Sequence, residues 1–311
     1  MIKSFYFYIK QFVKYLDGVR NYSPKTLISY ETDLKQFAEF LKVFFETDED
    51  IKINLKDINV FVLKSYLSYL YEQHKIDIKK TQKYVNKSVS RKISTLKSFF
   101  KYLKLEKLID KNPSVRLIFP KLPKKLPTFL TEEEVTSMLD HKSLTDTKFL
   151  DKAILELFYS TGIRLSELIN LKTSDIDFYS GHIKVLGKGS KYRIVPFGSK
   201  ADTALKNYLQ IREISDIKKS EYFFIDNKGN KLYPMKVYRM VNKNISEVSG
   251  IKKKSPHVLR HTFATHLINN GAEIRPVSEM LGHASLSSTQ VYTHLSLDVL
   301  KKAYKQAHPK A

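Results

Sequence analysis

The sequence predicts a mainly α-helical protein of two domains, in which an all-helical N-terminal domain precedes a C-terminal α+β domain that contains a small β-hairpin. Three observations support this prediction: helical spacing of apolar residues in the first third, a proline-rich segment after it, and two β-rich runs within an otherwise helical second half. A chain of 311 residues is long enough for two separate cores. We expect domains at 1–111 and 128–311, joined by a basic linker at 112–127.

Four helices are expected in the N-terminal domain. Residues 1–16 form an amphipathic pattern, Ser23-Pro24 is a typical helix start, and residues 60–71 carry a third apolar stripe. The fourth helix is predicted to begin at Ser88, and its apolar face consists of Val89, Ile93, Leu96, Phe100 and Leu103. The linker contains three prolines between Pro120 and Pro127, which exclude a continuing helix.

The second domain is predicted to alternate short helices with one hairpin. Thr131 to Glu134 is a capping-box start, and Gly162 separates two helices between residues 158 and 171. The runs 182–186 and 192–197 form a hairpin with lysines at its tip. Further helices are predicted to begin at Ser255-Pro256, to cover residues 274–281 before Gly282, and to follow Ser285.

The charge of the chain favours a nucleic-acid partner. The sequence has 54 Lys and Arg against 32 Asp and Glu, a net charge of +22, and residues 79–125 are densely basic. The helix from Ser88 would present Arg91, Ser94, Thr95, Ser98 and Lys101 on its polar face, and a solvated lysine face is the alternative. The DNA-binding candidates are Lys87, Arg91, Lys97, Lys101, Lys121, Lys124 and Lys125.

Several classes of protein are excluded by the sequence. The absence of cysteine excludes disulfide scaffolds, thiolate zinc sites and cysteine nucleophiles. No apolar run is long enough to cross a membrane, so we expect a cytoplasmic protein associated with the nucleoid. Gly187-Lys188-Gly189 is not a P-loop, because Gly181 lies one position too early and no Ser or Thr follows Lys188.

Five of the nine histidines lie between residues 257 and 294 and require an explanation. His257 and His261 have the spacing of a helical zinc pair, but Arg260 between them would repel a cation, so we expect no metal. His261 or His266 is expected to be a hydrogen-bonded core histidine.

The remaining polar residues of this half form a set suited to phosphodiester chemistry without a metal. Two arginines can clamp phosphate oxygens and stabilise their growing charge, and histidine suits proton transfer. Tyrosine becomes a nucleophile only where a base or cations activate it. This reasoning does not choose one nucleophile among the 19 tyrosines.

The order and spacing of these motifs resemble the tyrosine recombinase (lambda-integrase-like) family. The matching residues are Arg164 with Leu165-Ser166-Glu167-Leu168, Lys188 in Gly-Lys-Gly, His257-Val258-Leu259-Arg260-His261, Leu281-Gly282-His283 and Tyr292-Thr293-His294. The N-terminal third is similar to the SAM-like core-binding domain of the family. The layout, which leaves no room for an arm-site domain, resembles the Xer-type members that resolve chromosome dimers.

The resemblance implies a two-domain clamp on double-stranded DNA and a role for each motif residue. Tyr292 would attack the scissile phosphate to form a 3′-phosphotyrosyl bond, Arg164 and Arg260 would clamp the phosphate, and His283 would donate to it. Lys188 would protonate the leaving 5′-oxygen, His257 would act as acid or base, and Glu167 is a supporting candidate. Neither a cofactor nor ATP is needed.

The resemblance also implies assembly and leaves alternatives open. Four protomers, identical or of two kinds, would pair two sites, with an activating partner protein in some systems. A C-terminal helix with Leu297, Leu300 and Tyr304 on its apolar side would dock on the neighbouring protomer or pack in its own chain. The alternatives to chromosome dimer resolution at a dif-like site are integration or transposition of a mobile element, a type IB topoisomerase, and an inert DNA-binding accessory protein.

Overall fold

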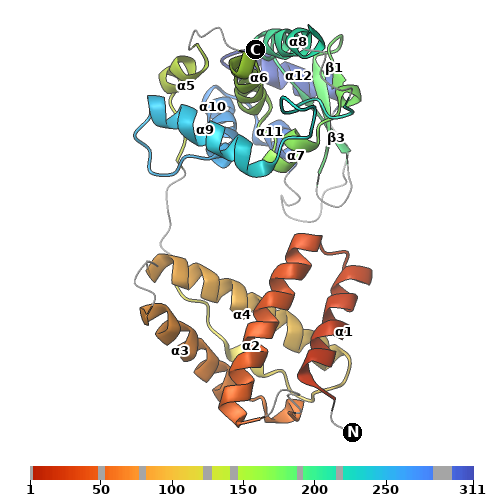
Figure 1. The fold of residues 1–311 in the computed structure, drawn as a ribbon, viewed down its shortest axis with the longest axis vertical. Coiled ribbons are helices and arrows are strands. Elements are labelled where there is room, and N and C mark those ends of the chain that lie inside the picture. The colour runs from red at the N-terminus through yellow and green to blue at the C-terminus, as the bar shows by residue number, and fades with distance from the viewer. Residues whose placement is uncertain are drawn as a thin grey trace. The chain divides into compact units, whose positions relative to one another are not determined.

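The structure is a computed structural model that describes residues 3–47, 53–76, 82–121, 128–140, 146–187, 192–214, 220–282 and 296–311. Its chain divides into two compact units, Met1–Lys125 and Leu126–Ala311, each with its own hydrophobic core (Figure 1). The division falls inside the predicted linker. None of the helices in these ranges is long and apolar enough to cross a lipid bilayer.

The N-terminal unit consists of helices packed around an aromatic core (Figure 1). The helices are α1 (Phe5–Gly18), α2 (Pro24–Phe45), α3 (Val60–Ile76) and α4 (Gln82–Leu105), with the 3₁₀ turns η1 (Leu55–Asp57) and η2 (Pro113–Arg116). Phe12 and Phe99 meet edge to face with ring centroids 5.3 Å apart, and Phe5 contacts both Phe37 and Phe99 in the same way. This packing of large rings from α1, α2 and α4 fixes the position of the basic helix α4.

Two boundaries differ from the sequence predictions. Helix α4 begins at Gln82, six residues before Ser88. The segment predicted as linker begins with packed residues, because η2 lies against α3 and α4 and both Ser114 and Leu117 are buried. A connector can therefore start only after Leu117.

The C-terminal unit is a helical domain with one small sheet. Its elements are α5 (Glu132–Leu139), α6 (Asp146–Thr161), α7 (Leu165–Asn170), η3 (Thr173–Asp175), β1 (Ile176–Asp177), β2 (His182–Leu186), β3 (Tyr192–Pro196), α8 (Ser199–Ile214), α9 (Pro234–Val248), α10 (Pro256–Asn269), α11 (Ile274–Leu281) and α12 (Leu297–Ala307). Helices α6 and α10 pack against each other in the core of this unit. The predicted α+β architecture is confirmed.

The sheet is antiparallel in the order β1-β2-β3. Ile183 pairs with Val195 and Leu186 with Tyr192, so the two predicted runs pair along their length as a hairpin. Inward residues Ile183, Val185 and Val195 are buried, as the alternation of apolar and polar residues requires. The hairpin tip, residues 188–191, lies outside the described residues.

Helix ends in this unit follow their local signals. Thr131 and Glu134 form the predicted capping box at α5, and Pro256 is the first residue of α10. Gly282 ends α11 with φ +63°, a left-handed conformation that favours glycine. The predicted helix start at Ser285 lies outside the described residues.

Helix α12 packs in the core of its own chain. Leu300 and Tyr304 are buried, and the Tyr304 hydroxyl lies 2.6 Å from Ser160 Oγ on α6. The exposed side of the same helix includes Val299 near its start. Docking of this helix on a neighbouring protomer stays a prediction.

His308, just beyond α12, should make the stability of the protein depend on pH. Its Nε2 lies 3.1 Å from the Tyr159 carbonyl oxygen, its Nδ1 accepts from Lys310 N, and burial lowers its pKa to about 4. As the pH falls, His308 takes up a proton in the unfolded chain before it does so in the folded protein. The contribution of His308 to stability is therefore fully present above the ordinary pKa of 6.5 and is lost as the pH falls towards 4.

The expected contribution of His308 is roughly 3 kcal/mol, of which about 2 kcal/mol should disappear by pH 5. Urea unfolding at pH 7 and pH 5 measures this decrease. His308→Gln should flatten the dependence, and His182→Gln on β2 is the matched control. An unchanged pH dependence in His308→Gln would disprove the assignment.

Candidate active site

The structure describes three of the six predicted catalytic residues, Arg164, His257 and Arg260, together with Glu167. Lys188, His283 and Tyr292 lie outside the described residues, as do the DNA-binding candidates Lys124 and Lys125. Figure 1 shows α7, α11 and β3 close together at one side of the C-terminal unit, and α10 packs against α11. These elements position the side chains described below.

Arg164 stands directly before α7 and is held by Glu167, one turn later. The Arg164 backbone NH donates to Glu167 Oε2 at 2.7 Å, and its Nη1 donates to Oε1 at 2.8 Å. The preceding turn requires Gly162, because φ there is +59° and a Cβ would lie 2.4 Å from the Phe263 ring. The turn at Gly162 therefore ends α6 and separates Arg164 from that helix.

Arg260 lies on α10 and is only 8% exposed. Its Nη1 donates to the Gly162 carbonyl oxygen at 2.6 Å and its Nη2 to the Leu281 carbonyl oxygen at 2.5 Å. These two bonds join the turn before Arg164 to the end of α11. The structure therefore brings the two predicted clamp arginines to the same helix end.

Three guanidinium groups meet at the C-terminus of α11. The carbonyl oxygens of Met280, Leu281 and Gly282 accept from Arg193, Arg260 and Arg164, at 2.7, 2.5 and 3.3 Å. The last carbonyls of a helix lack partners within it and carry the negative end of the helix dipole. This helix end therefore stabilises three like charges side by side.

Glu167 is the buried carboxylate among these cations. Burial raises its pKa, but hydrogen bonds and charge from Arg193, with further bonds from Arg164, outweigh burial and hold the pKa below its usual value. Arg193 donates Nη1 to Oε1 at 2.9 Å and Nη2 to Oε2 at 2.8 Å. Glu167 is therefore ionised at neutral pH, and it compensates only one of three positive charges.

The remaining positive charge makes this a candidate anion site. Burial first, and then the like charge of Arg164, lower the pKa of Arg260 to about 10. Arg260 is still a cation at neutral pH, and a phosphate beside it would relieve the repulsion between the arginines. Arrangements of this kind bind a phosphodiester and stabilise its more highly charged transition state.

Arg193 was not identified by sequence reasoning. It lies on β3 between exposed Tyr192 and Ile194, on the face of the sheet that also carries Val185 and Val195. An arginine at an inward position of an amphipathic strand is a signal of a buried ion pair. The sequence alone did not show that Glu167 is its partner.

The histidines of α10 have different environments. His257 lies one turn before Arg260, and its pKa is lowered by loss of surrounding water and by the charges of Lys253, Arg260 and Arg164. His261 is exposed. His266 is the core histidine, with Nδ1 3.0 Å from the Tyr159 hydroxyl and Nε2 2.8 Å from the Leu130 carbonyl oxygen. Within the described ranges, no group of His, Asp and Glu side chains could hold a metal ion.

The basic face of α4 carries most of the described DNA-binding candidates. Lys87, Arg91 and Lys101 are exposed at spacings that place them on one side of the helix, with Ser94 and Ser98 half-buried between them. Lys121 is also exposed, and Lys97 Nζ lies 5.0 Å from the ring centroid of Phe119. A cationic strip with short hydroxyls therefore follows α4.

Two of the residues expected in this basic region do not face solvent. Thr95, predicted on the polar face, is fully buried and donates to Asp33 Oδ2 at 3.0 Å. Lys92 is buried and donates to Asp33 Oδ1 at 2.9 Å. Arg91 also pairs with Asp33, so this carboxylate of α2 compensates part of the charge of α4. The prediction for Thr95 was wrong because the charge pattern does not reveal this partner, 62 residues away.

A cationic groove extends the strip towards α1. Ser98 and Lys101 line it together with Tyr22 and Arg20, and its volume is about 420 Å³. The lining residues also include Lys104 and Lys107 and no carboxylate. Arg20 is thus a further candidate for contact with DNA phosphates, and it lies too far from α4 in the sequence to be grouped with it there.

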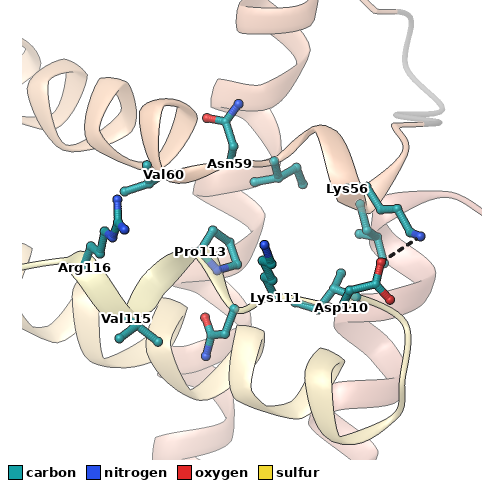
Figure 2. Close-up of a pocket in the computed structure, with 12 residues that line it drawn as sticks. Lys56, Asn59, Val60, Asp110, Lys111, Pro113, Val115 and Arg116 are labelled. Atoms are coloured by element: carbon teal, nitrogen blue, oxygen red, sulfur yellow. Dashed lines mark ion pairs between the residues drawn. The ribbon is translucent and has the colours of Figure 1, made fainter.

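A second groove of the N-terminal unit, of about 530 Å³, lies between the start of α3 and η2 (Figure 2). Figure 2 shows Asn59 and Val60 on one wall and Pro113, Val115 and Arg116 on the other, with Lys56 and Asp110 paired at 3.0 Å. This groove contains none of the candidate catalytic residues. Its charges are mixed, and we assign no function to it.

Charge reversal on α4 should weaken DNA binding without changing the chemistry. Lys87→Glu with Lys101→Glu is expected to lower affinity and to reduce the slope of log K against log salt by about 0.9 for each phosphate that the variant no longer neutralises. Filter binding at several salt concentrations measures the slope. Lys64→Glu on α3 is a control outside this strip, and an unchanged slope in the double variant would refute the role of the strip.

Two family models and several known proteins match this chain. Residues 128–298 match the family described as "Phage integrase family", and residues 9–107 match "Phage integrase, N-terminal SAM-like domain". The chain is 43% identical over 309 residues to "Tyrosine recombinase XerC" of Oceanobacillus iheyensis, covering 98% of this chain and 96% of that protein. It is 42% identical over 302 residues to the protein of the same name from Staphylococcus aureus, covering 96% of each.

Among solved structures, the fold resembles "XerH site-specific recombinase bound to difH substrate: pre-cleavage complex". The TM-score is 0.64 at 26% identity, covering 95% of this chain and 83% of that chain. The chain therefore belongs to the phage integrase family. Within that family it is a tyrosine recombinase of the Xer type, an enzyme of the site-specific DNA recombinase class, and the resemblance predicted from the motifs is confirmed.

Proposed function

We propose that this protein cuts and rejoins double-stranded DNA at a dif-like site and thereby resolves chromosome dimers. The observation that carries the proposal is the meeting of Arg164 and Arg260 at the end of α11. The near full-length similarity to proteins named tyrosine recombinase XerC supports the Xer-type role. The basic strip on α4 is suited to hold the DNA backbone.

The proposed reaction begins with cleavage of one strand. The phenolic oxygen of Tyr292 forms a bond to the scissile phosphorus and gives up its proton to His257. The bond from phosphorus to the 5′-oxygen breaks, and Lys188 supplies the proton that this oxygen needs. The products are a 3′-phosphotyrosyl bond and a free 5′-hydroxyl.

Rejoining reverses these steps with the 5′-hydroxyl of another strand. The energy of the phosphodiester is kept in the bond between protein and DNA, so the cycle needs neither ATP nor another cofactor. Arg164 and Arg260, with His283, stabilise the charge that grows on the non-bridging oxygens. Glu167 holds Arg164 in place through the bonds at 2.7 and 2.8 Å.

Two features of the site suit these assignments. The lowered pKa of His257 favours the neutral imidazole at neutral pH, which is the form that accepts a proton. Arginine keeps its charge at neutral pH and binds two phosphate oxygens at once.

Recombination requires two paired sites, and we propose that four protomers assemble on them. The protomers are identical, or two come from a second recombinase. Exchange of α12 between neighbouring protomers would link their active sites. Its buried face, with Leu300 and Tyr304, is the surface that such an exchange would move.

Covalent trapping on genomic DNA, followed by sequencing of the captured ends, tests the function. The proposal predicts one chromosomal locus near the terminus of replication. Capture at the ends of a mobile element would instead indicate integration or transposition. Capture at many unrelated sequences, with relaxation of a plasmid by the monomer, would indicate a topoisomerase.

A further inference from the structure

Arg164 and Arg193 share one buried carboxylate. Glu167 Oε1 accepts from Arg164 Nη1 at 2.8 Å and from Arg193 Nη1 at 2.9 Å. Its Oε2 accepts from the Arg164 backbone NH at 2.7 Å and from Arg193 Nη2 at 2.8 Å. A carboxylate can accept about four hydrogen bonds, so these four donors saturate Glu167. Arg193 supplies two of the three donors that come from side chains, and Arg164 supplies one.

The two arginines differ in how far a ligand can reach them. The Arg164 side chain is 32% exposed, whereas that of Arg193 is 10% exposed and that of Glu167 is 4% exposed. Arg193 also donates Nε to the Met280 carbonyl oxygen at 2.7 Å, so all three of its guanidinium nitrogens have acceptors within the protein. Gly282 fits closely against it, since a Cβ there would lie 3.1 Å from Arg193 Cδ. Arg164 is therefore the arginine of this pair that can bind a phosphate, and Arg193 holds groups of the protein.

Loss of Arg193 would change the partner of Arg164. Glu167 would be left in a buried position with two of its four donors missing, and an incompletely paired buried carboxylate is costly. Arg164 is already bonded to this carboxylate, and two parallel hydrogen bonds are the favoured geometry between an arginine and a carboxylate. Arg164 Nη2, which donates to the Gly282 carbonyl oxygen at 3.3 Å, would then turn to Glu167. The charge of Arg164 would be used within the protein.

We propose that Arg193 is a positioning residue that occupies Glu167 and thereby keeps the Arg164 guanidinium available to the scissile phosphate. The proposal rests on the proposed function, in which Arg164 and Arg260 clamp that phosphate. Arg193 acts through Glu167 and Arg164, and not on the DNA itself. Arg193→Lys keeps a positive charge but cannot bind both oxygens of the carboxylate in parallel, so it should be a milder form of Arg193→Gln.

A substrate with a neutral scissile linkage separates this role from a general loss of structure. In a methylphosphonate, a methyl group replaces one non-bridging oxygen and removes the negative charge. An arginine that stabilises charge on these oxygens therefore contributes less to the cleavage rate. A partly unfolded protein, in contrast, loses the same factor on both substrates. The substrates are nicked duplexes of the captured site with a phosphate or a methylphosphonate at the scissile position, and the faster methylphosphonate stereoisomer is compared.

The full-length variants are Arg164→Ala, Arg193→Gln, Arg193→Lys, the double variant Arg164→Ala/Arg193→Gln and the control Arg212→Gln. Arg212 is a matched control because its guanidinium also donates to protein groups. Its Nη1 binds the carbonyl oxygens of Tyr222 and Phe223, each at 2.9 Å, and its Nη2 binds that of Ser220 at 2.8 Å. Thermal unfolding and DNA binding of each variant show whether it folds. Rates of adduct formation are measured in single turnover at saturating DNA.

Arg193→Gln should form the adduct about 100-fold more slowly than wild type on the phosphate, and less than about 10-fold more slowly on the methylphosphonate. Arg193→Lys should show the same pattern with a smaller defect on the phosphate, and it decides the question if Arg193→Gln does not fold. Arg164→Ala should also be relieved by the methylphosphonate. On that substrate the double variant should be no slower than Arg164→Ala, because Arg193 acts through Arg164. Arg212→Gln should change both rates by the same factor.

Four results would overturn the proposal. They are equal defects of the Arg193 variants on both substrates, no defect on either, an Arg164→Ala defect that the methylphosphonate does not relieve, and a double variant slower than Arg164→Ala on the methylphosphonate. If wild type formed no adduct on the phosphate substrate, the proposed function itself would fail.

Discussion

Tyr292→Phe is expected to form no covalent adduct with DNA while it binds DNA with near wild-type affinity. The substitution removes only the phenolic oxygen, so the arginines and the basic strip on α4 still bind phosphate. A nicked duplex of the captured site traps the adduct, because the short strand beyond the nick diffuses away and prevents rejoining. Denaturing gel electrophoresis then separates free protein from protein bound to DNA.

The control for this variant is phenylalanine at another tyrosine. Tyr304 lies on the same C-terminal segment, but its hydroxyl is buried against Ser160, so Tyr304→Phe should form the adduct and lose only some stability. Adduct formation by Tyr292→Phe at the wild-type rate would assign the nucleophile to another residue.

Arg260→Ala is expected to slow cleavage by a factor of about 100 to 1,000, on the order of 3 kcal/mol or more in transition-state stabilisation. Removal of the guanidinium takes away one of the groups that stabilise charge on the phosphate oxygens. It also frees the carbonyl oxygens of Gly162 and Leu281, so a decrease in stability is expected as well.

Single-turnover rates at saturating DNA, at a temperature well below unfolding, separate the two effects. The cleavage rate of Arg260→Lys should lie between those of wild type and Arg260→Ala. Lysine keeps one positive charge but lacks the planar guanidinium group that binds two phosphate oxygens at once. Arg212→Ala is the matched control, because it removes a guanidinium that also binds backbone carbonyls. If Arg260→Ala cleaved DNA as fast as Arg212→Ala, the proposed role of Arg260 in binding the scissile phosphate would be contradicted.

Arg260→Ala should also shift the pH dependence of the cleavage rate. The charge of Arg260 helps to lower the pKa of His257, so its removal raises that pKa. If His257 accepts the proton of Tyr292, the rate falls when the imidazole is protonated. The acid limb of the profile of Arg260→Ala should therefore lie at higher pH than that of wild type.

Local signals in the sequence were enough to predict the elements that hold the site. The capping box at Thr131, the hairpin from residue 182 and the helix that stops at Gly282 each depend on a few neighbouring residues. The pair Arg164 and Glu167 was predictable for the same reason, because the two residues are one helical turn apart.

Interactions between distant parts of the chain were not predictable. Arg193 meets Glu167 across 26 residues and Met280 across 87, and no local pattern names these partners. Thr95, which was predicted on the polar face of α4, and Lys92 of the same basic region are buried against Asp33 of α2. The start of α4 at Gln82 was not predicted, and packing of later turns of this helix against α2 stabilises it.

The central claim is that a phenolic oxygen of this chain becomes bonded to a DNA 3′-phosphate within reach of the arginine pair. The most direct measurement is mass spectrometry of the peptide recovered from the trapped adduct after nuclease digestion. The account predicts a residual nucleotide, attached through its 3′-phosphate, on Tyr292. A nucleotide on any other side chain, or a wild-type protein that carries none, would contradict it.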